Sequence, residues 1–244
     1  MRRLLFTLAI SCVFASGAFA SNPAADAVGE PGGAFGTRAD FAVLTSFAVG
    51  GPALTDIWCT GLGWHGGIFW VCGGDFDGDG SNGSGDNGIY FYDEAGTYIG
   101  GFPQPTLDTW GWRDSGYDGG HLMYGASAPH GGNIFYVDAN TLNVDYEVGG
   151  CPWTTCRAIA IELSAGGVVQ YKVGNFSDNL ATMLWTVGPA NAMEMSQCAS
   201  PGAAYGLAYD TGNNGIWVTS ADYSGELYAI DPITCNLLNT YNML

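Results

Sequence analysis

The sequence predicts an all-β protein built from repeated units of four short antiparallel strands. Glycine accounts for 39 of 244 residues without a collagen triplet, which indicates many tight turns. Aromatic residues make up 14% of the chain and charged residues only 12%, so its composition is that of a folded chain and not of a disordered one. A strand pattern recurs about every 46 residues and supplies the repeat.

Each repeat contains an apolar strand that ends in aspartate and a small turn. The clearest copies are residues 89–93, 134–138 and 227–231, and a degenerate copy stands at 183–187. The strands expected before them are 68–71, 122–124, 168–171 and 216–218, and the inner strands are 55–58, 112–114, 157–160 and 205–208. The expected last strands are 97–99, 144–148 and 237–240. Four strands per unit and about four units predict a β-propeller whose blades bury their apolar faces against one another.

The aspartates of these turns have a plain structural role. We expect Asp93, Asp138 and Asp231 to accept hydrogen bonds from backbone amides of their hairpin turns.

One strand near the N-terminus stands outside the repeat. Residues 44–51 resemble the end of a unit, 144–150, but lack the strands that should precede it. We expect residues 38–53 either to close the ring within the chain, as part of four blades or as a fifth, or to add to a sheet edge of another molecule. The single propeller domain is therefore expected over residues 38–244.

The first residues predict export. Two arginines, an apolar run over 4–14 and the small-residue site at 18–20 describe a secretory signal peptide over residues 1–20, cut after Ala20. The apolar run is too short to span a bilayer, so we expect a secreted, extracellular protein without membrane insertion. Residues 21–37 are rich in Ala, Gly and Pro and are expected to form a flexible leader.

The charge balance excludes some partners. The chain has 6 basic and 23 acidic residues, a net charge of −17 that becomes −19 once the two N-terminal arginines are removed. Nucleic-acid binding needs clustered Lys and Arg, so it is excluded, and anionic membrane surfaces are disfavoured. Cations are the favoured partners.

Six cysteines remain after the signal peptide is removed, which predicts disulfides in an exported chain. The expected pairs are Cys59–Cys72, Cys151–Cys156 and Cys198–Cys235. A structural zinc site is the alternative, but the sequence has no C-x2-C pair.

An aspartate-rich loop over residues 75–86 fits the pattern D-x-D-x-D-G-x5-D. Calcium takes six to eight oxygen ligands, and alternating carboxylates supply several around one point. The expected ligands are the side chains of Asp75, Asp77, Asp79 and Asp86 and the carbonyl of Ser81. Asp86 is shorter than the usual glutamate, which predicts weaker or less selective binding. The alternative is a solvated acidic turn without metal.

Strands flank this loop on both sides, so it is not part of a helical EF-hand. With the blade pattern, it resembles the calcium loops of integrin-α-type and related secreted bacterial β-propellers. The resemblance implies that calcium braces the blade and is not catalytic. It departs from that family at Gly83, where an acid is usual, and covers one loop and the blade pattern only.

No catalytic motif is present: the sequence has no G-x-S-x-G, H-E-x-x-H or phosphate loop. The candidates for acid–base chemistry are His65, His121 and His130, of which the first two precede second strands and favour a turn role. Arg113 and Arg157 recur 44 residues apart on inner strands. They are expected to line the central channel or to pair with Asp114 and Glu162.

The function that we expect is a non-catalytic extracellular structural or adhesive role, with self-assembly through the N-terminal strand as one route. A carbohydrate- or protein-binding module is an alternative, because eight tryptophans and thirteen tyrosines could include a binding face. A small hydrolase or lyase that acts at the ring axis through His121 or Arg113 is another.

Overall fold

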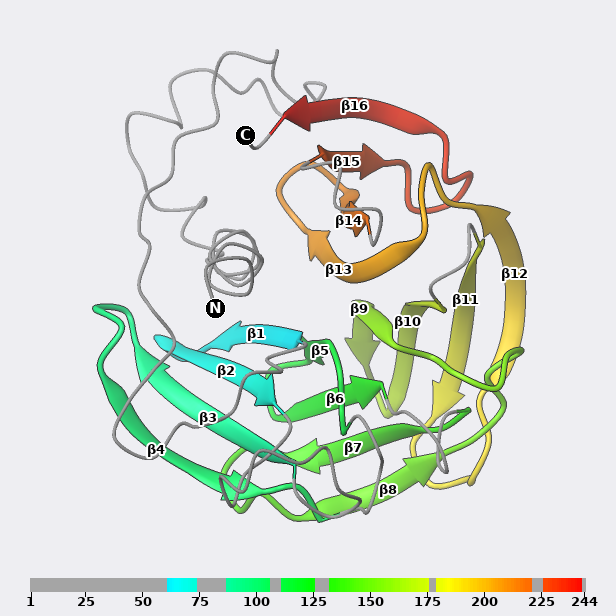
Figure 1. Ribbon diagram of the computed structural model, residues 1–244. Coiled ribbons are helices and arrows are strands. Elements are labelled where there is room, and N and C mark those ends of the chain that lie inside the picture. The colour runs from blue at the N-terminus through cyan, green and yellow to red at the C-terminus, as the bar shows by residue number, and fades with distance from the viewer. Residues whose placement is uncertain are drawn as a thin grey trace.

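A computed structural model describes residues 61–73, 87–105, 111–125, 132–175, 179–220 and 226–242. These residues form four sheets of four antiparallel strands each, arranged around a central axis as a four-bladed β-propeller (Figure 1). The predicted fold class is therefore confirmed. Among the described residues, no helix is long and apolar enough to cross a membrane.

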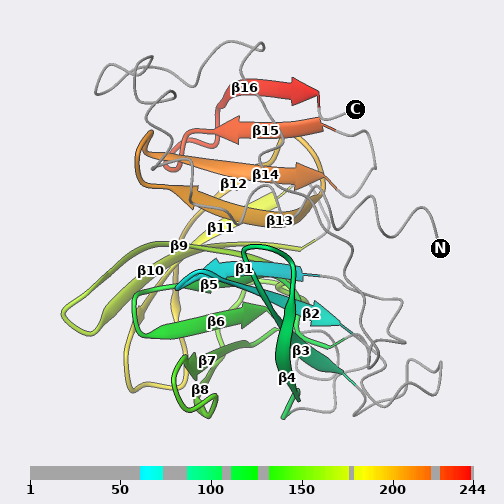
Figure 2. The same cartoon turned by 90° about the vertical axis from the view of Figure 1, so that its left-hand side faces the viewer.

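Every blade runs outward in sequence order, from an inner strand at the axis to an outer strand at the rim. The first two blades contain β1 (Gly61–His65), β2 (Ile68–Gly73), β3 (Gly88–Asp93), β4 (Tyr98–Pro103), β5 (Ser115–Tyr117), β6 (His121–Gly125), β7 (Ile134–Asp138) and β8 (Val144–Val148). The other two contain β9 (Ala158–Ala165), β10 (Val168–Gly174), β11 (Asn179–Thr186), β12 (Met193–Ala199), β13 (Ala204–Asp210), β14 (Gly215–Ser220), β15 (Glu226–Ile230) and β16 (Leu237–Asn242). Figure 2 shows this outward order for β13 to β16.

The predicted inner strands differ most from the observed ones. The inner strand of the first blade is β1, later than the predicted 55–58, which lies outside the described residues. The second, β5, begins just after the predicted 112–114. Glycine causes the mismatch, because inner strands crowd the axis and a side chain at Gly61 would overlap the Arg113 carbonyl. A Cβ on Gly116 would lie 2.8 Å from Ile161 Cγ1. Crowding thus selects a residue that weakens the sequence signal of a strand.

Aromatic side chains fill the spaces between blades, as predicted. Trp112 stacks on Tyr124 and Phe135, with ring centroids 4.9 and 4.8 Å apart, and Trp185 meets Tyr136 edge-on at 5.0 Å. All of these except Tyr136 are 1% exposed or less, and Tyr136 is 3% exposed. Such pairs stabilise the ring through apolar burial and ring geometry together.

The turn aspartates act as predicted. The Thr97 N–H donates to Asp93 Oδ1 over 2.7 Å. Asp138 Oδ1 accepts from the N–H groups of Asn140 and Thr141, and Asp231 Oδ1 accepts equivalent bonds from the N–H groups of residues 233 and 234. These carboxylates therefore complete hairpin turns in three blades.

Two disulfides join the predicted cysteines. Cys151 pairs with Cys156 within a local loop, and Cys198 pairs with Cys235. The second bond links β12 of the third blade to the turn after β15 of the fourth. Cys72 is buried in β2, whereas Cys59 lies outside the described residues, so the third pair stays a prediction.

Several other predictions also fall outside the described residues. They concern the signal peptide and leader, the strand over 38–53, the calcium loop over 75–86 and His130.

Candidate functional site: a cavity on the propeller axis

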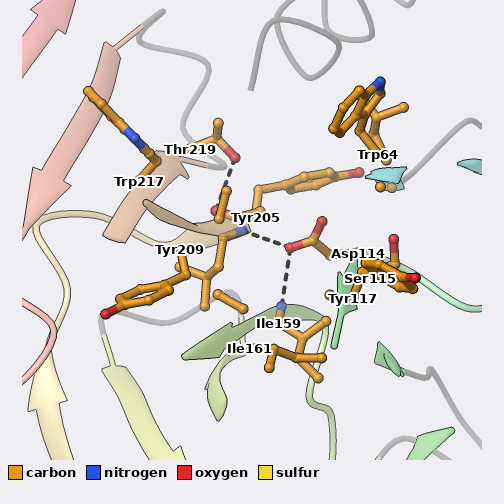
Figure 3. Close-up of a pocket in the computed structure, with 18 residues that line it drawn as sticks. Trp64, Asp114, Ser115, Tyr117, Ile159, Ile161, Tyr205, Tyr209, Trp217 and Thr219 are labelled. Carbon is orange, nitrogen blue, oxygen red and sulfur yellow. Dashed lines mark hydrogen bonds between the residues drawn. The ribbon is translucent and has the colours of Figure 1, made fainter. Parts of the chain in front are cut away.

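The four inner strands line an open cavity of about 250 Å³ on the propeller axis. Its walls come from β1, β5, β9 and β13, with two side chains of β14 added (Figure 3). Every blade therefore contributes to one site, although the contributing residues are spread from position 61 to position 219 of the chain. Ligand pockets in proteins span roughly 300–1,000 Å³, so this cavity suits a small ligand.

Asp114 is the hub of this site. It directly precedes β5 and is only 5% exposed. One carboxyl oxygen, Oδ2, accepts hydrogen bonds from the backbone N–H groups of Leu207 (2.7 Å) and Ile159 (3.1 Å). Figure 3 shows the bond between Asp114 and Ile159. Those residues belong to β13 and β9, so a single carboxyl group joins three blades across the axis.

The environment of Asp114 also favours its neutral form. Burial raises the pKa of this carboxyl group to about 8, although hydrogen bonds from the backbone N–H groups of Leu207, Ile159 and Ser115 act to lower it. At neutral pH the group is then mostly protonated and offers an O–H donor beside the cavity. Carboxyl groups with strongly raised pKa values cluster at functional sites, so Asp114 is a candidate site residue.

Hydroxyl groups add further polarity to the wall. Ser115 is 9% exposed, and its Oγ has no hydrogen-bond partner among the described residues. Thr219 Oγ1 instead donates to the Gly206 carbonyl oxygen over 3.3 Å. Ser115 is therefore the wall residue with a hydrogen bond still to make, and a bound ligand could supply the partner.

Aromatic rings form much of the remaining wall. They belong to Trp64, Tyr117, Tyr205, Tyr209 and Trp217. Several are held in place from behind: Tyr117 stacks on His65 with centroids 4.0 Å apart, and the Trp217 indole N–H donates to Asp210 Oδ2 over 3.2 Å. The Tyr209 hydroxyl donates to Asn214 Oδ1 over 2.7 Å. These contacts position rigid apolar faces around the polar centre.

The predicted arginines lie beside the axis but not in the cavity wall. Arg113 is buried, and burial lowers its pKa to about 10, while the Tyr205 hydroxyl raises it and the charge of Arg157 lowers it again. The two guanidinium groups are therefore electrostatic neighbours. Asp114 and Glu162 were the expected partners of these arginines. Asp114 Oδ2 accepts hydrogen bonds from backbone amides, and Glu162 Oε1 lies 3.7 Å from Lys172 Nζ.

The two described histidines have separate surroundings. His65 lies behind Tyr117, and burial lowers its pKa. His121, which the sequence suggested as a residue of an axial enzyme, does not line the cavity. It lies at the start of β6 beside Asp118 and Asp145.

Sequence reasoning missed the role of Asp114 and the ring of aromatic residues. One signal was available: Asp114 is an acid in an inner-strand segment where the third and fourth units have apolar residues such as Ile159 and Leu207.

The fold defines a four-bladed β-propeller as the class of protein, and a cavity lies among its inner strands. No family model matches the chain, and no curated protein matches it. A solved chain described as "Crystal Structure of Mitotic Checkpoint Complex" is similar with a TM-score of 0.48 and 13% identity, over 78% of this chain and 51% of that chain. The protein thus spans about half the length of that solved chain, and we draw no function from the likeness.

Proposed function

We propose that this protein is an exported propeller that binds a small neutral sugar unit of an extracellular glycan in its axial cavity. Its role is adhesive or structural and not catalytic. The observation that carries the proposal is the composition of the cavity wall, which combines aromatic faces with neutral hydrogen-bonding groups.

The chemistry of a sugar matches this wall. Sugar rings present C–H faces that pack against aromatic rings, and hydroxyl groups that donate and accept hydrogen bonds. The free Ser115 hydroxyl and the neutral Asp114 carboxyl group offer complementary partners. Among the described wall residues there is no Lys, Arg or His, so nothing there favours an anionic ligand.

The same wall argues against glycoside hydrolysis. Most glycosidases use two carboxyl groups on either side of the scissile bond. Among the described residues that line the cavity, Asp114 is the one carboxylic acid, and its Oδ2 is occupied by two backbone amides. We therefore assign Asp114 to binding and to holding the blades together.

Calcium and self-association belong to the proposal as supporting features. The ligands Asp75, Asp77, Asp79, Ser81 and Asp86 lie in the connection between β2 and β3, where a bound ion would brace the first blade. The N-terminal strand over 38–53 would join copies by strand addition and make a weak sugar site multivalent. The motif and the strand pattern support these features.

The test is sugar binding by the mature chain with calcium present. Titration with neutral mono- and disaccharides should change the intrinsic tryptophan fluorescence, because two tryptophans line the cavity. Tyr117→Ala should weaken binding at least tenfold. Tyr146→Ala is the matched control, because both tyrosines are 37% exposed and Tyr146 lies on the outer strand β8. Equal affinities of the two variants, or no binding by the wild type, would refute the proposal.

A further inference from the structure

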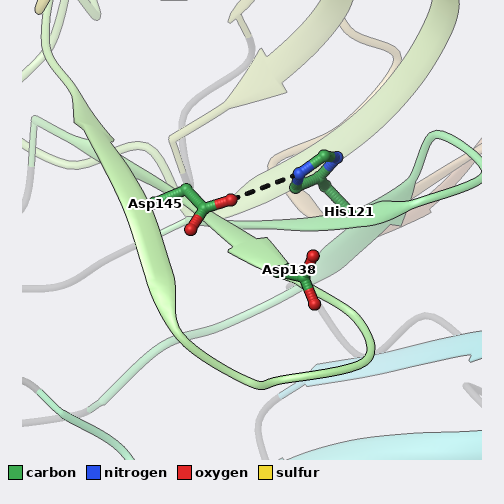
Figure 4. Close-up of side chains that lie close together, drawn as sticks. All are labelled: His121, Asp138 and Asp145. Atoms are coloured by element: carbon green, nitrogen blue, oxygen red, sulfur yellow. Dashed lines mark ion pairs between the residues drawn. The ribbon is translucent and has the colours of Figure 1, made fainter.

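A second group of side chains gathers on the second blade, away from the cavity wall. His121, Asp138 and Asp145 come from β6, β7 and β8, and one ligand atom of each lies within 4.8 Å of the others (Figure 4). His121 Nε2 is 3.3 Å from Asp145 Oδ2. Their spacing along the sequence matches no metal motif; the blade brings them together.

Strand register explains the gathering. His121 and Asp138 are direct partners across β6 and β7. Between β7 and β8 the register shifts, so that Tyr136 pairs with Tyr146 and Val137 pairs with Val144. Asp145 is the extra residue of this bulge. Bulges re-aim side chains and are frequent beside functional sites.

The other blades show what the fold itself requires at these positions. The same bulge in the first blade leaves out Ile99, and in the fourth blade it leaves out Leu238. The position of His121 is taken by Ile68 in the first blade, where Ile68 pairs with the turn aspartate Asp93. The turn aspartate is thus common, whereas the histidine and the second aspartate are particular to the second blade.

The bulge residues of the first and fourth blades are exposed to solvent. Ile99 is 55% exposed and Leu238 is 49% exposed, so the bulge tolerates apolar residues in contact with water. The fold does not need a carboxylate at position 145 or an imidazole at position 121. A function for these two residues is therefore the better explanation.

The imidazole of His121 lies between two carboxylates and against an aromatic ring. Its ring stacks on Tyr136, with centroids 4.1 Å apart and an interplanar angle of 17°. Its Nδ1 faces Asp118 Oδ1 at 3.7 Å, and its Nε2 faces Asp145. Metal-bound histidines typically have a carboxylate on the nitrogen opposite the metal, which fixes the tautomer.

Asp118, on the side of the imidazole opposite Asp145, is held in place by several hydrogen bonds. Its Oδ2 accepts hydrogen bonds from the hydroxyl groups of Tyr136 and Ser164, and its Oδ1 accepts from the N–H groups of Gly120 and His121. These four hydrogen bonds fix the orientation of the Asp118 carboxyl group beside His121.

We infer that His121, Asp138 and Asp145 form a site for a divalent transition metal of the zinc type. One neutral imidazole and two carboxylates balance a charge of +2. A nitrogen ligand favours such a metal over calcium, which takes oxygen. Asp138 Oδ1 accepts the backbone N–H groups of its turn, and the carboxylate also accepts a hydrogen bond from the Thr141 hydroxyl; Oδ2 is the oxygen that we assign to the metal. Zinc ligands lie about 2.0–2.2 Å from the ion, so the ligand atoms must draw together when the metal binds, and water completes the coordination.

The experiment measures zinc binding to the mature chain. Metal-free protein is titrated with ZnCl2 by calorimetry in excess calcium, which occupies the predicted loop over 75–86. Cobalt is then substituted, and its visible absorption reports nitrogen ligation. We expect one tight site per chain. His121→Ile and Asp145→Leu, which copy the first and fourth blades, should weaken binding at least about 100-fold, and Asp118→Asn about 10- to 100-fold.

A matched control separates ligation from turn formation. Asp138→Asn keeps an oxygen for the turn but loses a charged ligand, and it should weaken zinc binding. Asp231→Asn makes the same change at the equivalent turn of the fourth blade and should leave zinc affinity unchanged. Thermal unfolding of each variant without zinc shows whether it is folded. If His121→Ile does not fold, the zinc affinity of Asp145→Leu tests the inference instead. The inference is wrong if wild-type protein binds no zinc in excess calcium, or if the folded variants bind it as the wild type does.

Discussion

Replacing Asp114 with asparagine or alanine tests whether one neutral carboxyl group holds three blades together. Alanine removes the acceptor of the Leu207 and Ile159 N–H groups. Each buried donor left without a partner costs about 1–3 kcal/mol, so the free energy of unfolding of Asp114→Ala should be about 2–6 kcal/mol lower than that of Asp114→Asn. Asparagine keeps an oxygen for both amides and has the shape of the protonated acid. Its cost should be small near pH 4, where the wild-type carboxyl group is largely protonated in both the folded and the unfolded state.

The pH dependence makes this prediction sharper. The folded-state pKa of Asp114 is raised to about 8, so its contribution to stability is fully present below the unfolded pKa near 4. It is lost as the pH rises toward 8, at up to about 1.4 kcal/mol per pH unit. Asp114→Asn cannot ionise, so it should already be more stable than the wild type at pH 7, by up to about 4 kcal/mol three pH units above the unfolded pKa, and by somewhat more at pH 9.

Urea denaturation of wild type and both variants, from pH 5 to pH 9 with calcium present, gives the required free energies. The difference between wild type and Asp114→Asn isolates this carboxyl group, because all other titratable groups are the same in both proteins. Parallel pH profiles of the two proteins would refute a buried, neutral Asp114. An Asp114→Ala protein as stable as Asp114→Asn would refute its role as acceptor.

Three further predictions concern the stability of the ring. Lys172 is fully buried, and its Nζ donates to Thr182 Oγ1 and the Pro232 carbonyl oxygen. Lys172→Ala should therefore lower the free energy of unfolding, measured in urea, by about 3–5 kcal/mol. A loss of less than about 1 kcal/mol would contradict this prediction. Cys198→Ala removes a disulfide between residues 37 apart in sequence and should lower the free energy of unfolding by about 2–4 kcal/mol. Reduction with a thiol should destabilise the wild type more than it destabilises this variant. Chelation of calcium should lower the melting temperature of wild type but not of Asp77→Asn, and equal shifts would disprove a calcium brace.

The sequence predicted the blades well because inter-blade packing requires apolar, aromatic strands. Strands such as β3 and β7 are almost completely buried, so their composition alone indicates their structure. The outer strand β12 was missed for the opposite reason. Nearly all of its residues are exposed, and its pairing with β11 makes it a strand. The inner strands were misplaced where crowding requires glycine.

The candidate sites depend on contacts that sequence spacing does not reveal. Asp114 bonds to residues 45 and 93 positions later, which are one and two repeats along the chain. The repeat predicts that equivalent strands meet at the axis, but it does not tell which side chain crosses it. Likewise, the position of Asp145 follows from a bulge, and a one-residue shift of register has no signature in composition.

The most direct test of sugar recognition is a crystal structure of the mature protein with the sugar that binds best in the fluorescence titration. The proposed function predicts that the sugar occupies the axial cavity between β1, β5, β9 and β13, within hydrogen-bond distance of Ser115 Oγ and packed against Tyr117. A sugar bound on the outer surface, with the axial cavity empty of ligand, would contradict it.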